Sequence, residues 1–126
     1  MGSFKIEGGK SLSGEIQPQG AKNEALQILC AVLLTAEPVL IENVPEIIDV
    51  QKLIRLLQKL GVKVASKGPN RYEFQADDVA VDYLSSPSYK EEGRGLRGSI
   101  MLVGPMLARF GVGSIPRPGG DKIGRR

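Results

Sequence analysis

Two kinds of helical pattern alternate with short strand patterns along the chain. Residues 24–34 are apolar on nearly every face of a helix, and such a helix is normally covered on all sides. Residues 47–60 place apolar side chains on one face by helical spacing, which predicts an amphipathic helix. Gly61 follows directly and suits a helix C-terminus, because glycine adopts left-handed backbone angles easily. The pattern therefore predicts one buried helix and one half-exposed helix.

Short apolar or alternating runs bounded by turn residues predict strands around these helices. The predicted strands are residues 4–7 and 12–16 around Gly8-Gly9, 39–42, 62–65 and 72–75 around a turn at 68–70, and a short one near 79–81. Residues 96–110 repeat the apolar character of the first helix, with a kink expected at Pro105 and an end at Gly111. Lys22 opens one apolar helix and Arg97 opens the other, which hints at a βαβ-like unit used twice. These patterns predict an α/β fold.

Composition excludes several classes of function. The 126 residues contain no histidine and one cysteine, so histidine-ligated metals, histidine-dependent nucleophilic catalysis and an internal disulfide are excluded within this chain. Cys30 lies in an apolar run, where a buried and inert thiol is expected. The longest apolar run is too short to span a bilayer, and the first residues lack a signal peptide's features, so a cytoplasmic protein without membrane contact is expected.

The charge pattern favours anionic ligands. The net charge is +3, and the excess of arginine and lysine is concentrated between residues 94 and 126. Such a bias attracts phosphates, carboxylates or nucleic acid, and a solvated basic surface is the plain alternative. Aromatic residues make up only 5% and tryptophan is absent, which argues against stacking platforms for single-stranded nucleic acid. A small basic anion- or nucleic-acid-binding module remains a rival interpretation.

Three places carry candidate chemistry. Gly20-Ala21-Lys22-Asn23 brings a lysine and an amide to a helix N-terminus, which binds anions through free N–H groups; alternatively, Asn23 caps the helix and Lys22 is solvated. Arg97 precedes an apolar helix and is expected to need a carboxylate or phosphate partner, whereas Arg109 near that helix's end suits a structural role. Asp121 lies in a glycine-rich loop between basic residues. Its two interpretations are a general acid beside an anionic substrate and an ordinary turn residue.

Several motifs occur in an order and spacing that extend this interpretation. They are Gly20-Ala21-Lys22-Asn23-Glu24-Ala25-Leu26, Glu42-Asn43-Val44-Pro45, Leu96-Arg97-Gly98-Ser99-Ile100, Gly104-Pro105, Ala108-Arg109-Phe110-Gly111, and Pro118-Gly119-Gly120 followed by Ile123-Gly124 and Arg126. In these motifs the chain resembles the N-terminal part of the UDP-N-acetylglucosamine 1-carboxyvinyltransferases, a family of UDP-N-acetylglucosamine enolpyruvyl transferases. The sister family of shikimate-pathway enolpyruvyl transferases typically has serine after the lysine and lacks the Pro-Gly-Gly loop. It is the second alternative.

The resemblance implies a fold and a domain organisation. The fold would be an inside-out α/β barrel of the enolpyruvyl transferase type, built from repeated βαβ-like units with helices inside and sheets facing outward. Residues 1–21 would be strands of the second domain, and residues 22–126 would start the first domain, with the catalytic loop at about 112–126. The remainder of the enzyme would be a missing C-terminal portion of the same chain. The 126 residues alone are therefore expected to be inactive.

The resemblance also implies an activity. The family transfers the enolpyruvyl group of phosphoenolpyruvate to the 3′-hydroxyl of UDP-N-acetylglucosamine and releases phosphate, the first committed step of peptidoglycan synthesis. The hydroxyl adds to C2 of phosphoenolpyruvate while C3 receives a proton, and the tetrahedral intermediate then expels phosphate. The two substrates are the expected partners, with no nucleic acid, no membrane, no metal and no cofactor.

By the same resemblance, five residues receive roles. Lys22 and Asn23 would bind phosphoenolpyruvate, Arg97 and Arg126 would bind UDP-N-acetylglucosamine, and Asp121 would be the general acid. Many members have cysteine where this chain has Asp121, and the epoxide antibiotic fosfomycin alkylates that thiol. A free aspartic acid has a pKa of about 3.9, so a proton-donor role requires surroundings that favour the neutral form, such as closure over an anionic substrate.

Overall fold

The computed structural model of the chain describes residues 2–117. Its elements in chain order are α1 (Lys22–Ala31), η1 (Val32–Leu34), β1 (Val39–Ile41), α2 (Ile48–Lys59), β2 (Lys63–Gly68), β3 (Arg71–Gln75), η2 (Val81–Ser85), α3 (Pro87–Arg94), η3 (Arg97–Leu102) and α4 (Val103–Phe110), where η marks a 3-10 helix. The mixture of helices packed on a sheet confirms the α/β class that the sequence predicted.

The sheet has the strand order β1-β3-β2, and both neighbours of β3 run antiparallel to it. Strands β1 and β2 are therefore parallel to each other, and α2 connects them. This is a βαβ-like unit with a third strand inserted between its two strands. Phe74 on β3 faces Val39 on one side and Val64 on the other, and its side chain is fully buried. One face of the sheet thus meets the core.

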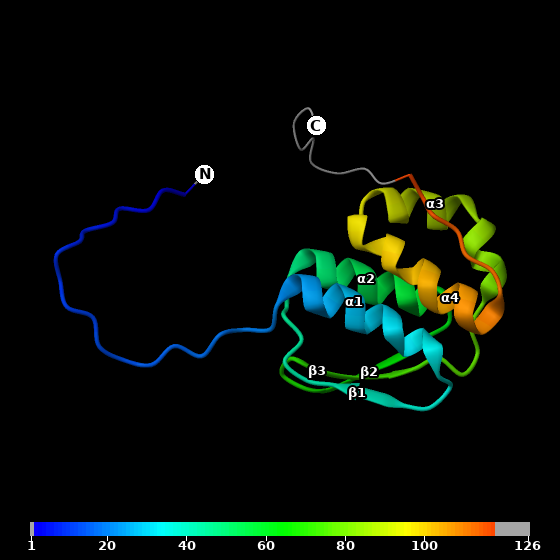
Figure 1. Ribbon diagram of the computed structural model, residues 1–126, viewed down its shortest axis with the longest axis horizontal. Coiled ribbons are helices and arrows are strands. Elements are labelled where there is room, and N and C mark those ends of the chain that lie inside the picture. Colours follow the sequence, from blue (N-terminus) through cyan, green and yellow to red (C-terminus); the bar gives the residue numbers. More distant parts are fainter. Residues whose placement is uncertain (1, 118–126) are drawn as a thin grey trace.

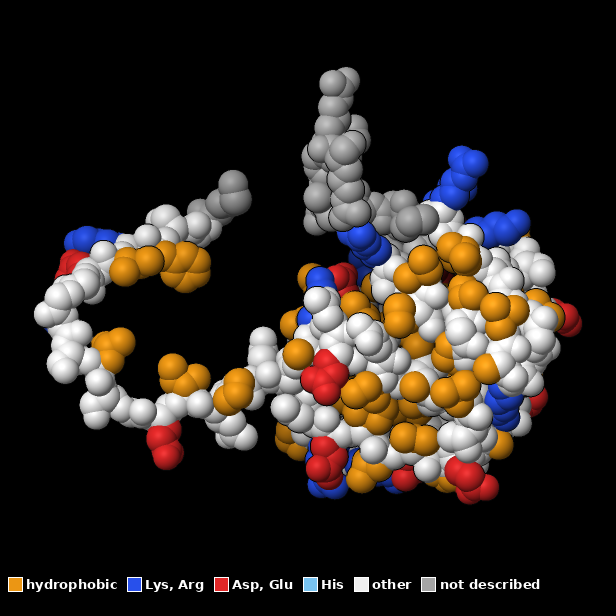
Figure 2. Space-filling model, in the orientation of Figure 1, with side chains coloured by type: hydrophobic (Ala, Val, Ile, Leu, Met, Phe, Trp, Pro, Cys, Tyr) orange, Lys and Arg blue, Asp and Glu red, His pale blue; other side chains and the backbone are white. Residues whose placement is uncertain are grey.

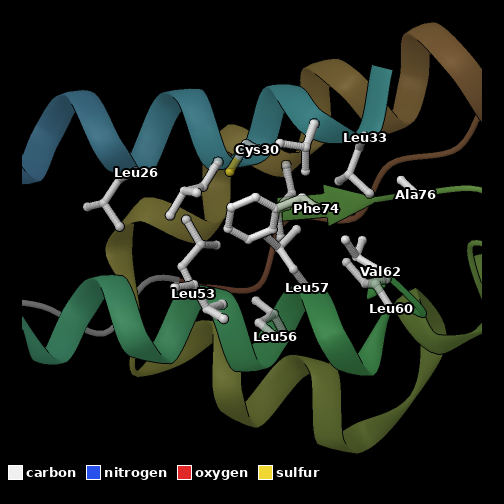
Figure 3. Packing of buried hydrophobic residues seen from close by; sticks show 14 of the residues in the cluster. Leu26, Cys30, Leu33, Leu53, Leu56, Leu57, Leu60, Val62, Phe74 and Ala76 are labelled. Carbon is white, nitrogen blue, oxygen red and sulfur yellow. The ribbon is translucent and has the colours of Figure 1, made fainter. Parts of the chain in front are cut away.

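Helices α1 and α2 lie side by side on that face, and η3, α3 and α4 lie beyond them on the side away from the sheet (Figure 1). The core between the layers consists of leucines of both helices packed around Phe74 and Cys30 (Figure 3). Leu29, Leu53 and Leu57 have no exposed surface. Helices α1 and α2 run in the same direction, so their N-termini lie at the same end of the helix pair (Figure 1).

The amphipathic helix and the hairpin confirm the sequence prediction closely. Helix α2 lies within the predicted range, and Gly61 after it has a φ of 98°, in the left-handed region that favours glycine. Strands β2 and β3 are joined at Gly68-Pro69-Asn70, where Gly68 and Asn70 have φ angles of 135° and 57°. Local patterns were sufficient for both elements because turn residues mark their ends.

Two groups of predicted strands do not form within residues 2–117. Residues 2–20 form no strand in the described structure and extend away from the helices, with Phe4 and Ile6 exposed at 96% and 89% (Figure 1). A strand requires a partner, and no described strand pairs with this segment. The strand expected near residues 79–81 is absent from the described part too, since the backbone there enters η2.

The apolar helices also differ from expectation. Helix α1 is not covered on all sides, because its residue Ile28 is 43% exposed. Leu34, which follows in η1, is 53% exposed. Residues 96–110 form η3 and then α4 rather than one helix, with the change occurring just before Pro105. Gly111 ends α4 in the left-handed conformation, as predicted. Residues 112–117, after α4, form no strand, so the described residues contain one βαβ-like unit and not two.

Arg109 has the structural role expected of it, by a different contact. Its Nη1 atom donates hydrogen bonds to the carbonyl oxygens of Leu33, Thr35 and Ala76 at 2.9, 3.1 and 2.7 Å. The guanidinium therefore satisfies carbonyl groups at the end of η1 and just after β3, not those of its own helix. By donating to carbonyls of two other segments, this charged side chain holds three segments of the chain together.

Burial of Cys30 gives a testable pH dependence. Burial raises the pKa of its thiol from an ordinary 9.0 to about 12, so the unfolded chain loses this proton first as the pH rises. The free energy of unfolding should therefore fall between pH 9 and 12, by on the order of 1.4 kcal/mol at pH 10 from this thiol. Urea unfolding at pH 7 and pH 10 measures the change. Cys30→Ala should remove this part of it, and an equal fall in that variant would contradict the assignment.

Candidate functional site

The start of α1 is fixed by the loop that follows β1. A Cβ atom on Gly20 would overlap the carbonyl oxygen of Asn43, so only glycine allows the two backbones to lie this close. The hairpin turn holds the same loop: the Asn70 side-chain amide donates to the Val44 carbonyl at 2.8 Å, and the Val44 N–H donates to the Asn70 carbonyl at 2.9 Å. The sheet thereby positions the first turn of α1.

The N-terminus of α1 is open to solvent. Ala21 occupies the N-cap position and no side chain accepts a hydrogen bond there. Asn23 is the second residue of the helix and is exposed, so the alternative that it caps the helix is wrong. An uncapped helix start presents free N–H groups and the positive end of the helix dipole, which together favour an anion. Lys22 and Asn23 stand at this position with their side chains exposed.

Lys22 already has an acidic partner. Its Nζ atom lies 3.0 Å from Oδ2 of Asp49 in the first turn of α2, and both side chains are roughly half exposed, at 49% and 40%. The two residues border an open hollow of about 490 Å³ that is also lined by Glu46, Ile47 and Ile48. One lysine and two carboxylates give this lining a net charge of −1. An anion bound here must therefore displace Asp49 from Lys22 or draw on further cations.

Arg97 supplies such a cation close to α1. It begins η3, and the next residue, Gly98, packs so tightly on α1 that an added Cβ would lie 3.0 Å from a methyl carbon of Leu26. The Arg97 side chain is exposed and makes no hydrogen bond or ion pair with any residue in 2–117. Residues 2–117 therefore supply no carboxylate partner for Arg97, and a bound phosphate as its partner stays a prediction. Its charge is available to a ligand.

The remaining two predicted site residues, Asp121 and Arg126, lie outside the described residues. The structure describes the beginning of their loop, residues 112–117, which we call the connector. Pro116 in the connector is buried, and Tyr89 of α3 donates a hydrogen bond to the carbonyl of Ser114 at 3.1 Å. The connector is thus held against α3.

Helix α3 and its contacts were missed by the sequence analysis. The helix has only one large nonpolar side chain, Tyr89, so its hydrophobic pattern is weak. A start signal was present: Ser86 caps the helix by accepting the Tyr89 N–H at 3.1 Å, and Pro87 occupies the first helical position. Buried Ser99, two residues after Arg97, also contacts this helix by donating to the Gly93 carbonyl at 3.2 Å.

The described surface shows what else the chain presents. Apolar side chains gather over α1 and α4 on the face shown in Figure 2. Ile28 of α1 and Leu107 of α4 are both exposed. Residues 2–117 contain no group of three or more carboxylate or thiol side chains placed to hold a metal ion. No helix in that range has both the length and the apolar character needed to cross a membrane.

Comparison with known proteins identifies the family. The sequence profile of EPSP synthase (3-phosphoshikimate 1-carboxyvinyltransferase) matches residues 6–126. The chain belongs to the EPSP synthase family. The match includes the start of α1, Arg97 and the glycine-rich loop, so all the candidate residues lie in the family's own region.

Individual relatives of the chain carry a more specific name than the family does. The chain is 58% identical over all 126 residues to proteins named UDP-N-acetylglucosamine 1-carboxyvinyltransferase from Bacteroides thetaiotaomicron and Bacteroides fragilis. It is 56% identical to the protein of the same name from Porphyromonas gingivalis. In each case the chain spans 29% of the relative's length. The resemblance inferred from the motifs is confirmed.

Proposed function

We propose that this chain is part of a UDP-N-acetylglucosamine 1-carboxyvinyltransferase, which transfers the enolpyruvyl group of phosphoenolpyruvate to UDP-N-acetylglucosamine. The observation that carries the proposal is 58% identity over the entire chain to proteins of that name. The start of α1 supports it, because an uncapped helix N-terminus with an exposed lysine and amide suits a phosphate ligand. The enzyme would act in the cytoplasm, in the first committed step of peptidoglycan synthesis.

The roles of the residues follow from the same proposal. Lys22 and Asn23 bind the phosphate of phosphoenolpyruvate at the helix start, and the anion competes with Asp49 for the lysine. Arg97 and Arg126 bind charged parts of UDP-N-acetylglucosamine. Asp121 donates the proton that C3 of phosphoenolpyruvate receives when the sugar hydroxyl adds to C2. Cations beside a phosphate stabilise charge in the transition state as well as in the bound substrate.

The full fold that we propose is the inside-out α/β barrel, with repeated units and a second domain. Two features support it. The sheet lies on one outer side with helices behind it, and exposed apolar residues on α1 and α4 leave a face for further helices. Residues 2–20 carry almost fully exposed Leu12 and Ile16, as expected of strands whose partners belong to the second domain. The C-terminal portion of the same protein would supply both.

Phosphate release tests the function directly. The complete protein should release phosphate from phosphoenolpyruvate when UDP-N-acetylglucosamine is present and should not do so with shikimate 3-phosphate. The 126-residue chain alone should release none above background, because the proposed cleft lies between two domains. Turnover with shikimate 3-phosphate would favour the sister enzyme. Salt-dependent binding of random oligonucleotides, with no turnover of either substrate, would favour a basic binding module.

A further inference from the structure

Helix α3 is tied to two segments at once. It holds the connector: the Tyr89 hydroxyl donates to the Ser114 carbonyl at 3.1 Å, and Pro116 packs on Gly93. It also holds η3, where the Ser99 hydroxyl donates to the Gly93 carbonyl at 3.2 Å. One short helix therefore fixes both the segment before Asp121 and the 3-10 helix that begins with Arg97.

The contacts to the connector are buried and specific. Tyr89 has no exposed surface, and its ring packs edge-on against Tyr83 with 5.9 Å between ring centres. Among the described residues, the Ser114 carbonyl is the only hydrogen-bond acceptor of its hydroxyl. A buried hydroxyl left without its acceptor is costly, so this bond holds the connector at a defined place.

Gly93 provides the second point of attachment. A Cβ atom on this residue would overlap the Pro116 ring and lie 2.7 Å from the Cβ atom of Pro116. Pro116 can therefore pack at this position only because residue 93 is glycine. Proline adds its own restriction, since its ring fixes φ. The connector is thus held at Ser114 and at Pro116, two residues apart, on successive turns of α3.

The distance along the chain makes this attachment relevant to the reaction. Asp121 follows Pro116 by five residues, and five residues span at most about 18 Å when fully extended. The place where Pro116 is held therefore limits where the Asp121 carboxyl can reach. Because the same helix holds η3, that limit is set relative to Arg97.

We propose that α3 is a positioning element for this site, with Tyr89 and Gly93 as positioning residues that set the base of the catalytic loop relative to Arg97. The inference rests on the proposed function. Loosening the connector should lower the rate of the chemical step more than substrate binding, because Asp121 then spends less time in reach of the reacting carbon. Tyr89→Phe should reduce kcat roughly tenfold and leave both KM values within about twofold.

The test uses the complete enzyme and a matched control. Tyr83→Phe removes a hydroxyl from the neighbouring tyrosine, whose partners Ser88 and Glu92 lie on α3 itself and not on the connector. Hydrogen exchange followed by peptide mass spectrometry should show faster exchange at residues 112–117 in Tyr89→Phe and no change there in Tyr83→Phe. Gly93→Ala, which displaces Pro116, should loosen the same peptide and lower kcat at least as much.

Each outcome decides between positioning and simple stability. Faster exchange confined to the connector, with the expected fall in kcat, supports the proposal. Unchanged exchange, faster exchange spread evenly over residues 22–110, or a loosened connector with unchanged kcat overturns it. If the wild-type complete protein shows no transferase activity, the proposed function fails, whereas the exchange result still reports whether α3 holds the connector.

Discussion

Lys22→Ala in the complete enzyme should lower kcat/KM for phosphoenolpyruvate roughly 100-fold, or about 2.7 kcal/mol, as expected when a charged contact to a phosphate is lost. In the structure Lys22 is the only lysine at the open start of α1, and its exposed side chain has only Asp49 as an ion-pair partner among the described residues. A half-exposed ion pair of this kind contributes at most about 1 kcal/mol. Loss of the pair alone therefore cannot produce the expected effect. Steady-state kinetics with varied phosphoenolpyruvate measures it.

Two controls separate ligand binding from the ion pair. Asp49→Asn removes the same pair but leaves the lysine free, so it should keep kcat/KM close to wild type or raise it. Lys63→Ala removes a lysine from a comparable exposed pair, with Asp77 at 2.7 Å, away from the site. Equal losses in Lys22→Ala and Asp49→Asn would show that Lys22 acts through the ion pair. Unchanged kinetics in Lys22→Ala would show that Lys22 is a solvated surface residue.

How far the sequence predicts this fold depends on whether the signal is local. Helix α2 and the β2–β3 hairpin were predictable because each carries its own periodicity and its own end signal, such as Gly61 or Asn70. Burial of α1 was overestimated because periodicity reveals which faces are apolar, not which neighbours are present to cover them. Residues 4–7 form no strand within residues 2–117 for a related reason, since pairing depends on a partner elsewhere in the protein.

In the candidate site, too, local features could be predicted from the sequence and tertiary contacts could not. The position of Lys22 and Asn23 at a helix start was readable from four consecutive residues. The partner of Lys22 was not, because Asp49 lies 27 residues away and meets it only when α1 and α2 pack in parallel. The three carbonyls that Arg109 binds were equally out of reach, since they belong to two other segments. Sequence analysis located the chemical groups, and tertiary packing decided their partners.

Asp121→Ala should abolish turnover in the complete enzyme while leaving the fold intact. Proton donation by a placed side chain contributes on the order of 100- to 10,000-fold to a rate, and alanine cannot donate a proton. Asp121→Asn keeps the shape of the side chain without an acidic proton and should fail similarly. Phosphate release under saturating substrates measures the loss, and an unchanged thermal unfolding curve checks the fold. Full activity in either variant would remove Asp121 from the proton-donor role.

Replacing Asp121 with cysteine is expected to make the enzyme sensitive to fosfomycin. This result would distinguish a catalytic loop with its acid at position 121 from a basic loop without that role. A thiolate attacks an epoxide carbon of fosfomycin, forming a carbon–sulfur bond as the ring carbon–oxygen bond breaks and the oxygen takes up a proton. A carboxylate is a much poorer nucleophile in this reaction, and Cys30 is buried with a pKa of about 12. The wild-type enzyme should therefore stay active and unmodified, whereas Asp121→Cys should be alkylated once and inactivated. Intact-protein mass spectrometry decides this, and an adduct on the wild-type chain would show that another residue occupies the reactive position.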